Sequence, residues 1–316
     1  MAITITTWNI QNFRQDDDVY AQKLDFLADT LHSLGSDVVA LQEVLDLKAL
    51  QDLSNRLGFH HFAASPDGRG NRVAFLTRNA PIQQQEIDQW QLPPDTVIRR
   101  FDSNGDIETL NSFPRSAFQI TVAYNGGEID IINAHLKSKL LTFSGHFSTS
   151  NETLRAQTAF FALELRVAEA TTLREQITGL LAADRNVVVL GDFNDGPEAA
   201  TTQILYGPPG SQPKGPEDAT RSNCAFQLED QGDEQRMFNI TKLIPEDIRW
   251  SRKYNGQEEL LDHILASAGL MLPRINGLRQ VPTMTIINSD TPNMIGAHPI
   301  AGGIVPDHAP VTAEFV

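Results

Sequence analysis

Short apolar runs of strand length alternate along this chain with longer segments whose hydrophobic residues recur at helical spacing. Residues 3–8 and 38–41 are short, apolar and rich in β-branched side chains, which is typical of buried strands. Between them, leucines fall three and four positions apart from residue 24 to residue 34, which predicts one face of a helix ending near Gly35. The N-terminal pattern therefore predicts a strand, a helix and a second strand in that order.

The middle of the chain predicts antiparallel pairing. Residues 72–77, 117–123 and 128–132 have strand-like patterns, and the last two flank an Asn125-Gly126 pair that favours a tight hairpin turn. Pairing of this kind disfavours a purely parallel, doubly wound sheet.

A long helix and a buried strand are predicted in the second half. Residues 152–183 carry an apolar stripe, and Asn151 is placed to cap the first turn. This helix leads into the apolar strand 187–190, after which Pro197 suits the first turn of a short helix through Leu205. Helices and strands thus continue to alternate in a mixed order.

A second hairpin is predicted where residues 248–254 and 259–265 flank an Asn-Gly pair. The segments near 86–112 and 207–235 show no regular period, and both are interpreted as surface insertions. Because polar site segments are spread along the whole length, residues 1–316 predict a single mixed α/β domain.

Composition restricts the class of protein. The chain has 316 residues, of which 41% are hydrophobic and 21% charged, which is typical of a globular protein with a substantial core. Its one cysteine excludes an intrachain disulfide, and no apolar stretch is long enough for a membrane span. The sequence as written predicts a cytoplasmic protein, and secretion remains open if a signal peptide has been removed.

The net charge of −15 argues against a broad, non-specific nucleic-acid surface. A site that binds a divalent cation must itself carry carboxylates, however, and the bound metal then supplies the positive charge that a phosphate meets first. Acidity therefore lowers the expected affinity for a phosphodiester substrate without excluding such a substrate.

Polar groups stand at the ends of the apolar runs. They are Asn9, Glu43, His135, Asp192, Asn194, Asp262, Asp307 and His308. Because a folded sheet can gather strand ends from distant parts of the chain, these side chains together predict a hydrolytic metal site. Taken alone, each has an ordinary interpretation: a salt-bridged carboxylate at Glu43, a turn at Asp192 and Asn194, and a structural histidine at His135.

The adjacent pair Asp307-His308 needs a separate interpretation. Neighbouring residues rarely bring their side-chain heads into contact, so His308 is predicted to take its carboxylate partner from elsewhere in the chain. Asp262 is the best candidate, because an apolar strand would otherwise bury its charge without compensation. His263 is interpreted as a structural residue on the opposite face of that strand.

The order and spacing of these groups resemble the endonuclease/exonuclease/phosphatase superfamily, on its deoxyribonuclease I-like branch. The segments that carry the resemblance are Thr7-Trp8-Asn9, Leu41-Gln42-Glu43-Val44, Pro114-Arg115-Ser116, Asn133 to Ser138, Gly191 to Asn194, Leu261 to Ile264 and Pro306 to Pro310. Pro306 stands where this family usually has Ser. The resemblance implies a four-layered α/β/β/α sandwich with two mixed sheets, and an active site at one edge.

The resemblance also implies a metal site and a water site. Asn9 and Glu43 would hold Mg²⁺ or Mn²⁺, with Asp307 close enough to assist, in the oxygen-rich sphere that such hard ions prefer. Asp192 and Asn194 would orient the attacking water and the phosphoryl oxygens.

Two histidines receive roles by the same resemblance. His308, held by Asp262, would act as general base or stabilise the pentacovalent phosphate. His135 and Arg115 would bind the non-bridging oxygens, and His135 is also a candidate for protonating the leaving group. A second acid that often supports that histidine in this family has no obvious match in residues 70–73.

The sequence therefore predicts a Mg²⁺- or Mn²⁺-dependent phosphodiesterase, with a nuclease acting on DNA as the leading hypothesis and RNA as the alternative nucleic acid. Lys137 and Lys139 would bind substrate phosphates, so weak, salt-sensitive cleavage with little sequence preference is expected. A phosphomonoesterase or a sphingomyelinase-like lipid phosphodiesterase on the same scaffold is one alternative, and a catalytically silent binding module is another. A monomer without a stable protein partner is expected.

Overall fold

The computed structural model describes most of the chain. The described residues are 2–102, 104–141, 143, 149–207, 235–271, 274–275, 278–279, 283–286 and 303–316. The predicted insertion at 207–235 lies outside them except at its two ends.

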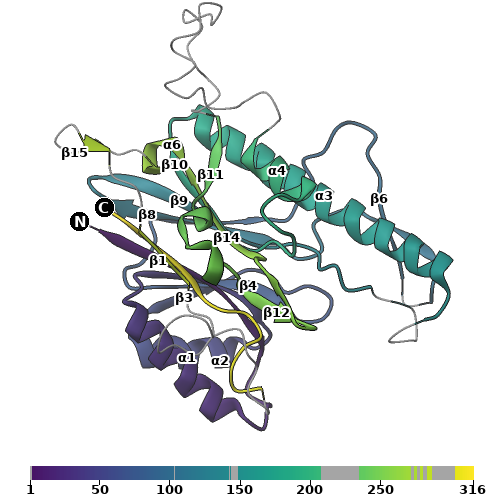
Figure 1. Cartoon of the computed structure of the whole chain (residues 1–316), viewed down its shortest axis with the longest axis horizontal. Coiled ribbons are helices and arrows are strands. Elements are labelled where there is room, and N and C mark those ends of the chain that lie inside the picture. The colour runs from purple at the N-terminus through teal and green to yellow at the C-terminus, as the bar shows by residue number, and fades with distance from the viewer. Residues whose placement is uncertain are drawn as a thin grey trace, which may run out of the picture.

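The first of two large sheets is built around the N-terminal strand. Its strands follow the order β17 (Thr283–Ile286), β18 (Val311–Phe315), β1 (Ile3–Phe13), β2 (Val38–Val44), β4 (Arg72–Thr77) and β3 (His60–Ala63). The pair β1 and β2 is parallel and the other neighbours are antiparallel. The two termini of the chain consequently lie close together, on adjacent strands (Figure 1).

The second large sheet is also mixed. Its order is β11 (Met237–Asn239), β14 (Asp262–Ser267), β10 (Asn186–Asp192), β9 (Gly127–His135), β8 (Ala117–Tyr124) and β5 (Gln83–Ile87). Only β10 and β9 run parallel, since the long helix α3 (Glu152–Ala182) connects them.

Helices cover the outer face of each sheet, and three apolar cores separate the layers (Figure 1). α1 (Tyr20–Leu34) and α2 (Leu47–Leu57) pack on the first sheet, whereas α3 and α4 (Ala200–Tyr206) pack on the second. The third core lies between the sheets and joins residues such as Ile5 and Phe75 to Ile120 and Ile264. The predicted α/β fold is confirmed, and this layering agrees with the expected four-layered sandwich.

The predicted turns and caps are confirmed by the backbone. Gly35 adopts a left-handed conformation with φ of 64° and ends α1. Asn125 and Gly126 have φ of 47° and 79°, which is the positive-φ pair that a tight β8–β9 hairpin requires. The Asn151 side chain accepts a hydrogen bond from the backbone N–H of Leu154 at the start of α3.

Other elements differ from the sequence predictions. α2 and β3 are additional, and α4 begins at Ala200 because the residues after Pro197 form a turn first. The hairpin around Asn255-Gly256 is formed by β12 (Arg252–Tyr254) and β13 (Gln257–Glu259), and the 3-10 helix η3 (Glu246–Ile248) precedes it. It is shorter than predicted, because most of the predicted second strand lies in β14, which pairs with β10. The small elements η2 (Ile240–Leu243), α6 (Ala268–Met271), β15 (Arg274–Ile275) and β16 (Leu278–Arg279) complete the described part.

The segment 86–112 contains regular structure. β6 (Ile98–Phe101) and β7 (Ile107–Leu110) form an antiparallel hairpin. Ile98 is buried against Leu165 and Ala168 of α3, so the hairpin rests on the outer side of that helix. This hairpin forms one wall of a cavity beside the candidate site.

Among the described residues, no helix is both long enough and apolar enough to span a bilayer.

A buried polar contact joins the two sheets beneath the candidate site. Gln42 Nε2 on β2 donates to Asn133 Oδ1 on β9 at 2.7 Å. Asn133 Nδ2 in turn donates to the backbone carbonyls of Leu41 and Ala74, at 3.0 and 2.9 Å. All three hydrogen bonds are buried, so the loss of either side chain would leave buried polar atoms without a partner.

Asn133→Ala is expected to lower the free energy of unfolding by roughly 2–4 kcal/mol, because two carbonyls and the Gln42 amide lose their partner in the core. Urea titration followed by circular dichroism measures the change. Asn55→Ala, on the exposed face of α2, serves as the control and should stay within about 0.5 kcal/mol of the parent. An equally small effect at Asn133 would contradict a stabilising role for the contact between Gln42 and Asn133.

Candidate active site

Three adjacent strands of the second sheet bring the central residues side by side. In the strand register, Asp192 on β10 lies opposite His135 on β9 and opposite Asp262 on β14. Gly191 makes this close approach possible, because a Cβ there would lie 1.8 Å from the carbonyl oxygen of Ala134. The sheet itself therefore places an imidazole and two carboxylates at one edge.

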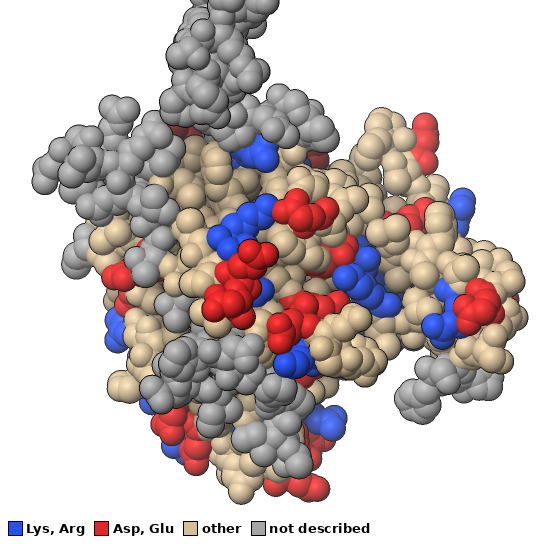
Figure 2. Space-filling view, in the orientation of Figure 1, with Lys and Arg blue, Asp and Glu red and all other residues tan. Residues whose placement is uncertain are grey.

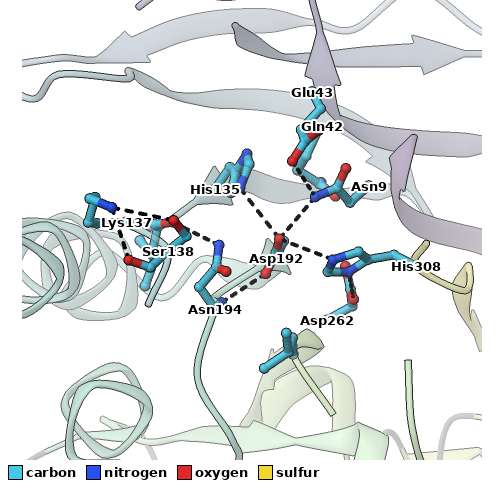
Figure 3. A network of polar contacts seen from close by, with 12 residues as sticks. Asn9, Gln42, Glu43, His135, Lys137, Ser138, Asp192, Asn194, Asp262 and His308 are labelled. Atoms are coloured by element: carbon cyan, nitrogen blue, oxygen red, sulfur yellow. Dashed lines mark hydrogen bonds and ion pairs between the residues drawn. The ribbon is translucent and has the colours of Figure 1, made fainter. Parts of the chain in front are cut away.

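The first sheet contributes an amide and a carboxylate to the same point (Figure 3). Asn9 Nδ2 donates to Asp192 Oδ2 at 3.0 Å and to Glu43 Oε1 at 3.1 Å. The other Glu43 oxygen accepts from the Asn12 backbone N–H at 3.0 Å, and Asn9 Oδ1 accepts from the Gln11 N–H at 3.0 Å. Glu43 is thus anchored to the strand end before any ligand binds.

This anchoring depends on unusual backbone geometry. Gln11, Asn12 and Glu43 have positive φ values of 49°, 52° and 61°, and the β1–β2 register shifts between Asn9 and Phe13. Non-glycine residues rarely adopt such angles outside turns, and they concentrate at functional sites. The irregular strand ends turn the Asn12 N–H and the Glu43 carboxylate toward each other.

The pair predicted between Asp262 and His308 is in contact. His308 Nδ1 lies 2.7 Å from Asp262 Oδ2, and both side chains are buried. Burial alone would lower the pKa of His308, but the Asp262 and Asp192 carboxylates outweigh it and raise that pKa to about 10. The His308 imidazole is therefore charged near neutral pH.

Asp192 is the centre of the polar network (Figure 3). Its Oδ2 lies 3.4 Å from His135 Nε2 and 3.9 Å from His308 Nε2, and its Oδ1 accepts from the Asn194 N–H at 2.8 Å. Burial, aided by the nearby Asp262 charge, raises the pKa of Asp192 to about 7, although His308 and Asn9 act in the opposite direction. A carboxylate with such a pKa is suited to exchanging a proton at neutral pH.

Oxygen ligands for a hard cation gather on the Glu43 side. The charges of Glu43 and Asp307 both act on the pKa of the Lys23 ammonium. Asp307 lies 3.5 Å from the Arg252 guanidinium and remains partly exposed. Carboxylates with spare lone pairs, beside an amide oxygen, fit the donor set that Mg²⁺ and Mn²⁺ prefer.

A second group of possible ligands lies deeper. Asp192, Asp262 and His308 each place a ligand atom within 4.8 Å of the others. His308 is a poor metal ligand in this state, because its Nδ1 is bonded to Asp262 and its ring is charged. The carboxylates Glu43 and Asp307 are more exposed, and Asn9 would need a rotated amide to present its oxygen, because its Nδ2 now faces Glu43 and Asp192.

His135 and Arg115 border the other side of Asp192. Burial lowers the pKa of His135 well below its ordinary value, and the Arg115, His308 and Lys137 charges add to the effect. The His135 ring is therefore neutral, and among the described residues its Nδ1 has no hydrogen-bond partner. Arg115 Nε bonds Asp67 Oδ2 at 3.2 Å, and its Nη1 donates to the His135 carbonyl at 3.3 Å.

The two lysines predicted to bind phosphate lie apart. Lys139 Nζ pairs with Asp195 Oδ1 at 3.3 Å and with Glu259 at 3.9 Å. Lys137 Nζ donates to the carbonyls of Ser138 and Leu140, and Lys137 lines the cavity beside the site, together with Arg115. Asn194 donates to the Leu136 carbonyl at 3.0 Å and so fixes the strand end beside Asp192.

Several supporting residues escaped the sequence analysis. Asp67 is the acid of the β3–β4 loop, and it supports Arg115 rather than the histidine. Lys23 is a buried lysine on α1 whose ammonium donates to the Gln11 carbonyl at 2.5 Å, holding the turn that positions Asn9 and Glu43. Its position on an amphipathic helix is typical of a solvated residue, so only the fold reveals this contact.

Asp195 and Glu169 were also missed. Asp195 Oδ2 bonds Arg166 Nε at 3.1 Å and Thr201 Oγ1 at 2.6 Å, which ties α3 and α4 to the strand end after Asp192. Glu169, buried in the middle of α3, accepts from the Lys137 backbone N–H at 2.6 Å. Burial raises the pKa of Glu169 to about 7, although the surrounding cations oppose it.

Glu169→Gln is expected to raise the melting temperature at pH 8 and to leave it nearly unchanged at pH 4.5. The folded pKa lies above the ordinary 4.5, so the stability that the neutral carboxyl provides is lost as pH rises from 4.5 through about 7. The upper limit of that loss is roughly 3 kcal/mol. Melting curves at both pH values test this, and Glu175→Gln, exposed on the same helix, should show no such difference.

Solved structures share this fold along nearly the whole chain. A family protein from Leptotrichia buccalis is 15% identical, with a TM-score of 0.57 and coverage of 99% of both chains. Humanized TDP2 from D. rerio is 16% identical, with a TM-score of 0.55, covering 100% of this chain and 99% of that one. The human Nocturnin catalytic domain is 15% identical, with a TM-score of 0.53, covering 100% and 94%. No curated protein matches the sequence.

Fold and site together define a phosphodiesterase-like scaffold of two mixed sheets with an acid and histidine site at their shared edge. The chain belongs to the Endonuclease/Exonuclease/phosphatase family, whose model matches residues 6–282. Members of this family are usually metal-dependent hydrolases, and the described residues include the acidic and histidine groups that could hold a metal.

Proposed function

We propose that the protein is a Mg²⁺- or Mn²⁺-dependent phosphodiester hydrolase that acts as a nuclease, with DNA as the preferred substrate and RNA as the alternative. The observation that carries this proposal is the position of Asp192 between a charged imidazole at His308 and a neutral one at His135. A phosphodiester that bound there would meet a proton acceptor, a positive charge and a neutral hydrogen-bonding group within one small site.

In the proposed reaction, Asp192 and His308 have different roles. Asp192, held by the Asn194 N–H and by Asn9, orients the attacking water and accepts its proton, as a carboxylate with a pKa near 7 can do. His308 stays protonated through Asp262, and it stabilises the charge that grows on the pentacovalent phosphate. Of the two roles that the family resemblance leaves open for His308, stabilisation therefore fits the charged ring better.

Two further groups complete the site. His135 and Arg115 bind non-bridging oxygens from the side opposite Glu43, with Arg115 held in place by Asp67. A divalent cation held by Glu43, Asp307 and Asn9 would offset the negative charge of the phosphate.

Two observations support a nucleic-acid substrate of limited length. A fold relative, D. rerio TDP2, has been solved complexed with a single strand DNA product, at 16% identity and a TM-score of 0.54. On the described part of the face in Figure 2, Lys and Arg lie interspersed with Asp and Glu instead of forming one broad basic surface. Such a surface suits contact with a few phosphates better than a grip on a long polyanion.

The deciding experiment is a substrate panel under one Mg²⁺ or Mn²⁺ condition. It compares plasmid nicking with cleavage of single-stranded DNA and RNA, and with hydrolysis of inositol phosphates and sphingomyelin. We expect cleavage of nucleic acid that weakens steeply as salt rises, because a few phosphate contacts supply the affinity. Release of inorganic phosphate or phosphocholine, with every nucleic acid left intact, would refute the nuclease and favour another member of the same scaffold.

A further inference from the structure

A cavity of about 860 Å³ opens beside the candidate active site. Four parts of the chain line it: the β3–β4 loop with Asp67 and Arg69, the β6–β7 hairpin with the residues that follow it, the residues after β9, and the first half of α3. Arg115 also lines the cavity while its Nη1 donates to the carbonyl of His135. The cavity and the phosphate side of the active site are therefore contiguous.

One wall of the cavity is aromatic. Phe101 of the hairpin and Phe161 of α3 meet edge to face, with ring centroids 5.0 Å apart and planes at 89°. Both rings are only half-buried, so each still presents apolar surface to the cavity. Half-exposed aromatic rings in a cavity are suited to stacking against a flat ring system.

The wall next to the active site carries charges of both signs. Arg115, Lys137 and Arg69 line it, together with Asp67, which pairs with Arg115, and Glu169. Burial lowers the pKa of Lys137 to about 8, although the Glu169 charge acts in the opposite direction. Arg69 is exposed, and among the described residues its guanidinium makes no hydrogen bond or ion pair. The cavity thus combines cations toward the scissile phosphate with aromatic rings farther away.

We propose that this cavity binds one unpaired nucleoside of the substrate, with its base against Phe101 and Phe161 and its phosphate facing Arg115 and Arg69. The proposal rests on the proposed nuclease function and specifies the substrate class as single-stranded or frayed ends. A base held in a duplex cannot reach a walled cavity without leaving its stack.

Other ligands on this scaffold fit the lining less well. A phosphocholine head group would contact the two rings through its quaternary ammonium, but it has no flat surface to stack on them. An inositol phosphate would use the cations but would leave the aromatic wall without a flat partner. The joint presence of both features favours a nucleotide.

The test uses three dinucleotides that share one phosphodiester. One has adenine on both sides, and each of the other two lacks the base on one side. We expect one abasic dinucleotide to show a KM raised roughly 10-fold with little change in kcat, because the lost stacking contributes to binding more than to the chemical step. Phe161→Ala should remove that difference. Leu163→Ala, at an exposed leucine of α3 that does not line this cavity, should preserve it.

Binding of a mononucleotide provides the second measurement and needs no turnover. Calorimetry with deoxyadenosine 5′-phosphate should give at least roughly 10-fold tighter binding than deoxyribose 5-phosphate, and Phe161→Ala should abolish the preference. Arg69→Ala should weaken both ligands equally, since it contacts the phosphate.

The two proposals can fail separately. If all three dinucleotides are hydrolysed with the same KM, or if both small ligands bind equally, the cavity does not bind a base and this inference is overturned while the nuclease stands. If none is hydrolysed but the mononucleotide preference is present and depends on Phe161, the cavity binds nucleosides and the proposed hydrolysis is wrong.

Discussion

Chelation of divalent cations is expected to abolish phosphodiester hydrolysis, and Mg²⁺ or Mn²⁺ is expected to restore it. The site concentrates four carboxylates, at Glu43, Asp192, Asp262 and Asp307, around a position that must accept a phosphate anion. Without a cation, their repulsion opposes substrate binding. A divalent ion offsets that repulsion and supplies the positive charge that the phosphate meets.

Glu43→Gln tests the ligand assignment directly. An amide keeps the hydrogen bond from the Asn12 N–H but removes the charge, so the cation concentration for half-maximal rate should rise and turnover should fall by about 10²-fold or more. The control is Asp25→Asn, an exposed acid of α1 paired with Arg56, which should change neither value. Full activity after exhaustive chelation, or an unchanged metal titration for Glu43→Gln, would rule out the metal mechanism.

Asp262→Asn should lower turnover by about 10²-fold or more and move the alkaline limb of the pH profile to lower pH. The Asp262 carboxylate raises the pKa of His308, so removing that charge lets the imidazolium lose its proton at lower pH. Because the charged ring is the working form proposed above, activity falls once the proton is lost. Rates measured from pH 5 to pH 10 with saturating metal give both quantities.

Asp262 is fully buried, so its variant must be shown to be folded. Circular dichroism and thermal melting provide that check. Asp37→Asn, at an acid that pairs with Arg78 near the start of β2, serves as the matched control and should leave the profile in place. A folded Asp262→Asn protein with the parent profile, in position and in height, would remove this pair from the mechanism.

The sequence predicted the central strands because they are continuous apolar runs, and it predicted α3 because several of its hydrophobic residues recur at helical spacing after a capping residue. Polar residues mark where β10 begins and ends, and the capping residue Asn151 marks where α3 begins. The β6–β7 hairpin could not be predicted in the same way, since alternating charges at Arg99, Arg100 and Glu108 resemble a solvated loop. Its stability depends on Ile98 packing against α3, which is a tertiary contact.

The residues of the site likewise fall into those that the sequence indicated and those that only the fold reveals. Strand ends indicated Asn9, Glu43, Asp192 and Asp262 as a group, because each residue alone has an ordinary interpretation and only their shared position beside apolar runs points to a site. Lys23 could not be indicated, because a lysine on an amphipathic helix normally faces water and its burial here depends on the Gln11 carbonyl above it. The direction of a long flexible side chain depends on the residues around it in the fold, and a single sequence does not show which residues those are.

Gly191 has a consequence for how this protein can diversify. Because no side chain fits against the Ala134 carbonyl, a substitution at this position would have to push β9 and β10 apart and would move Asp192 with them. The rim of the cavity is under no such constraint, since Arg69 is solvent-exposed and Phe101 belongs to a hairpin outside both sheets. Substitutions in the loop and hairpin can therefore change what the protein accepts without disturbing the centre of the site.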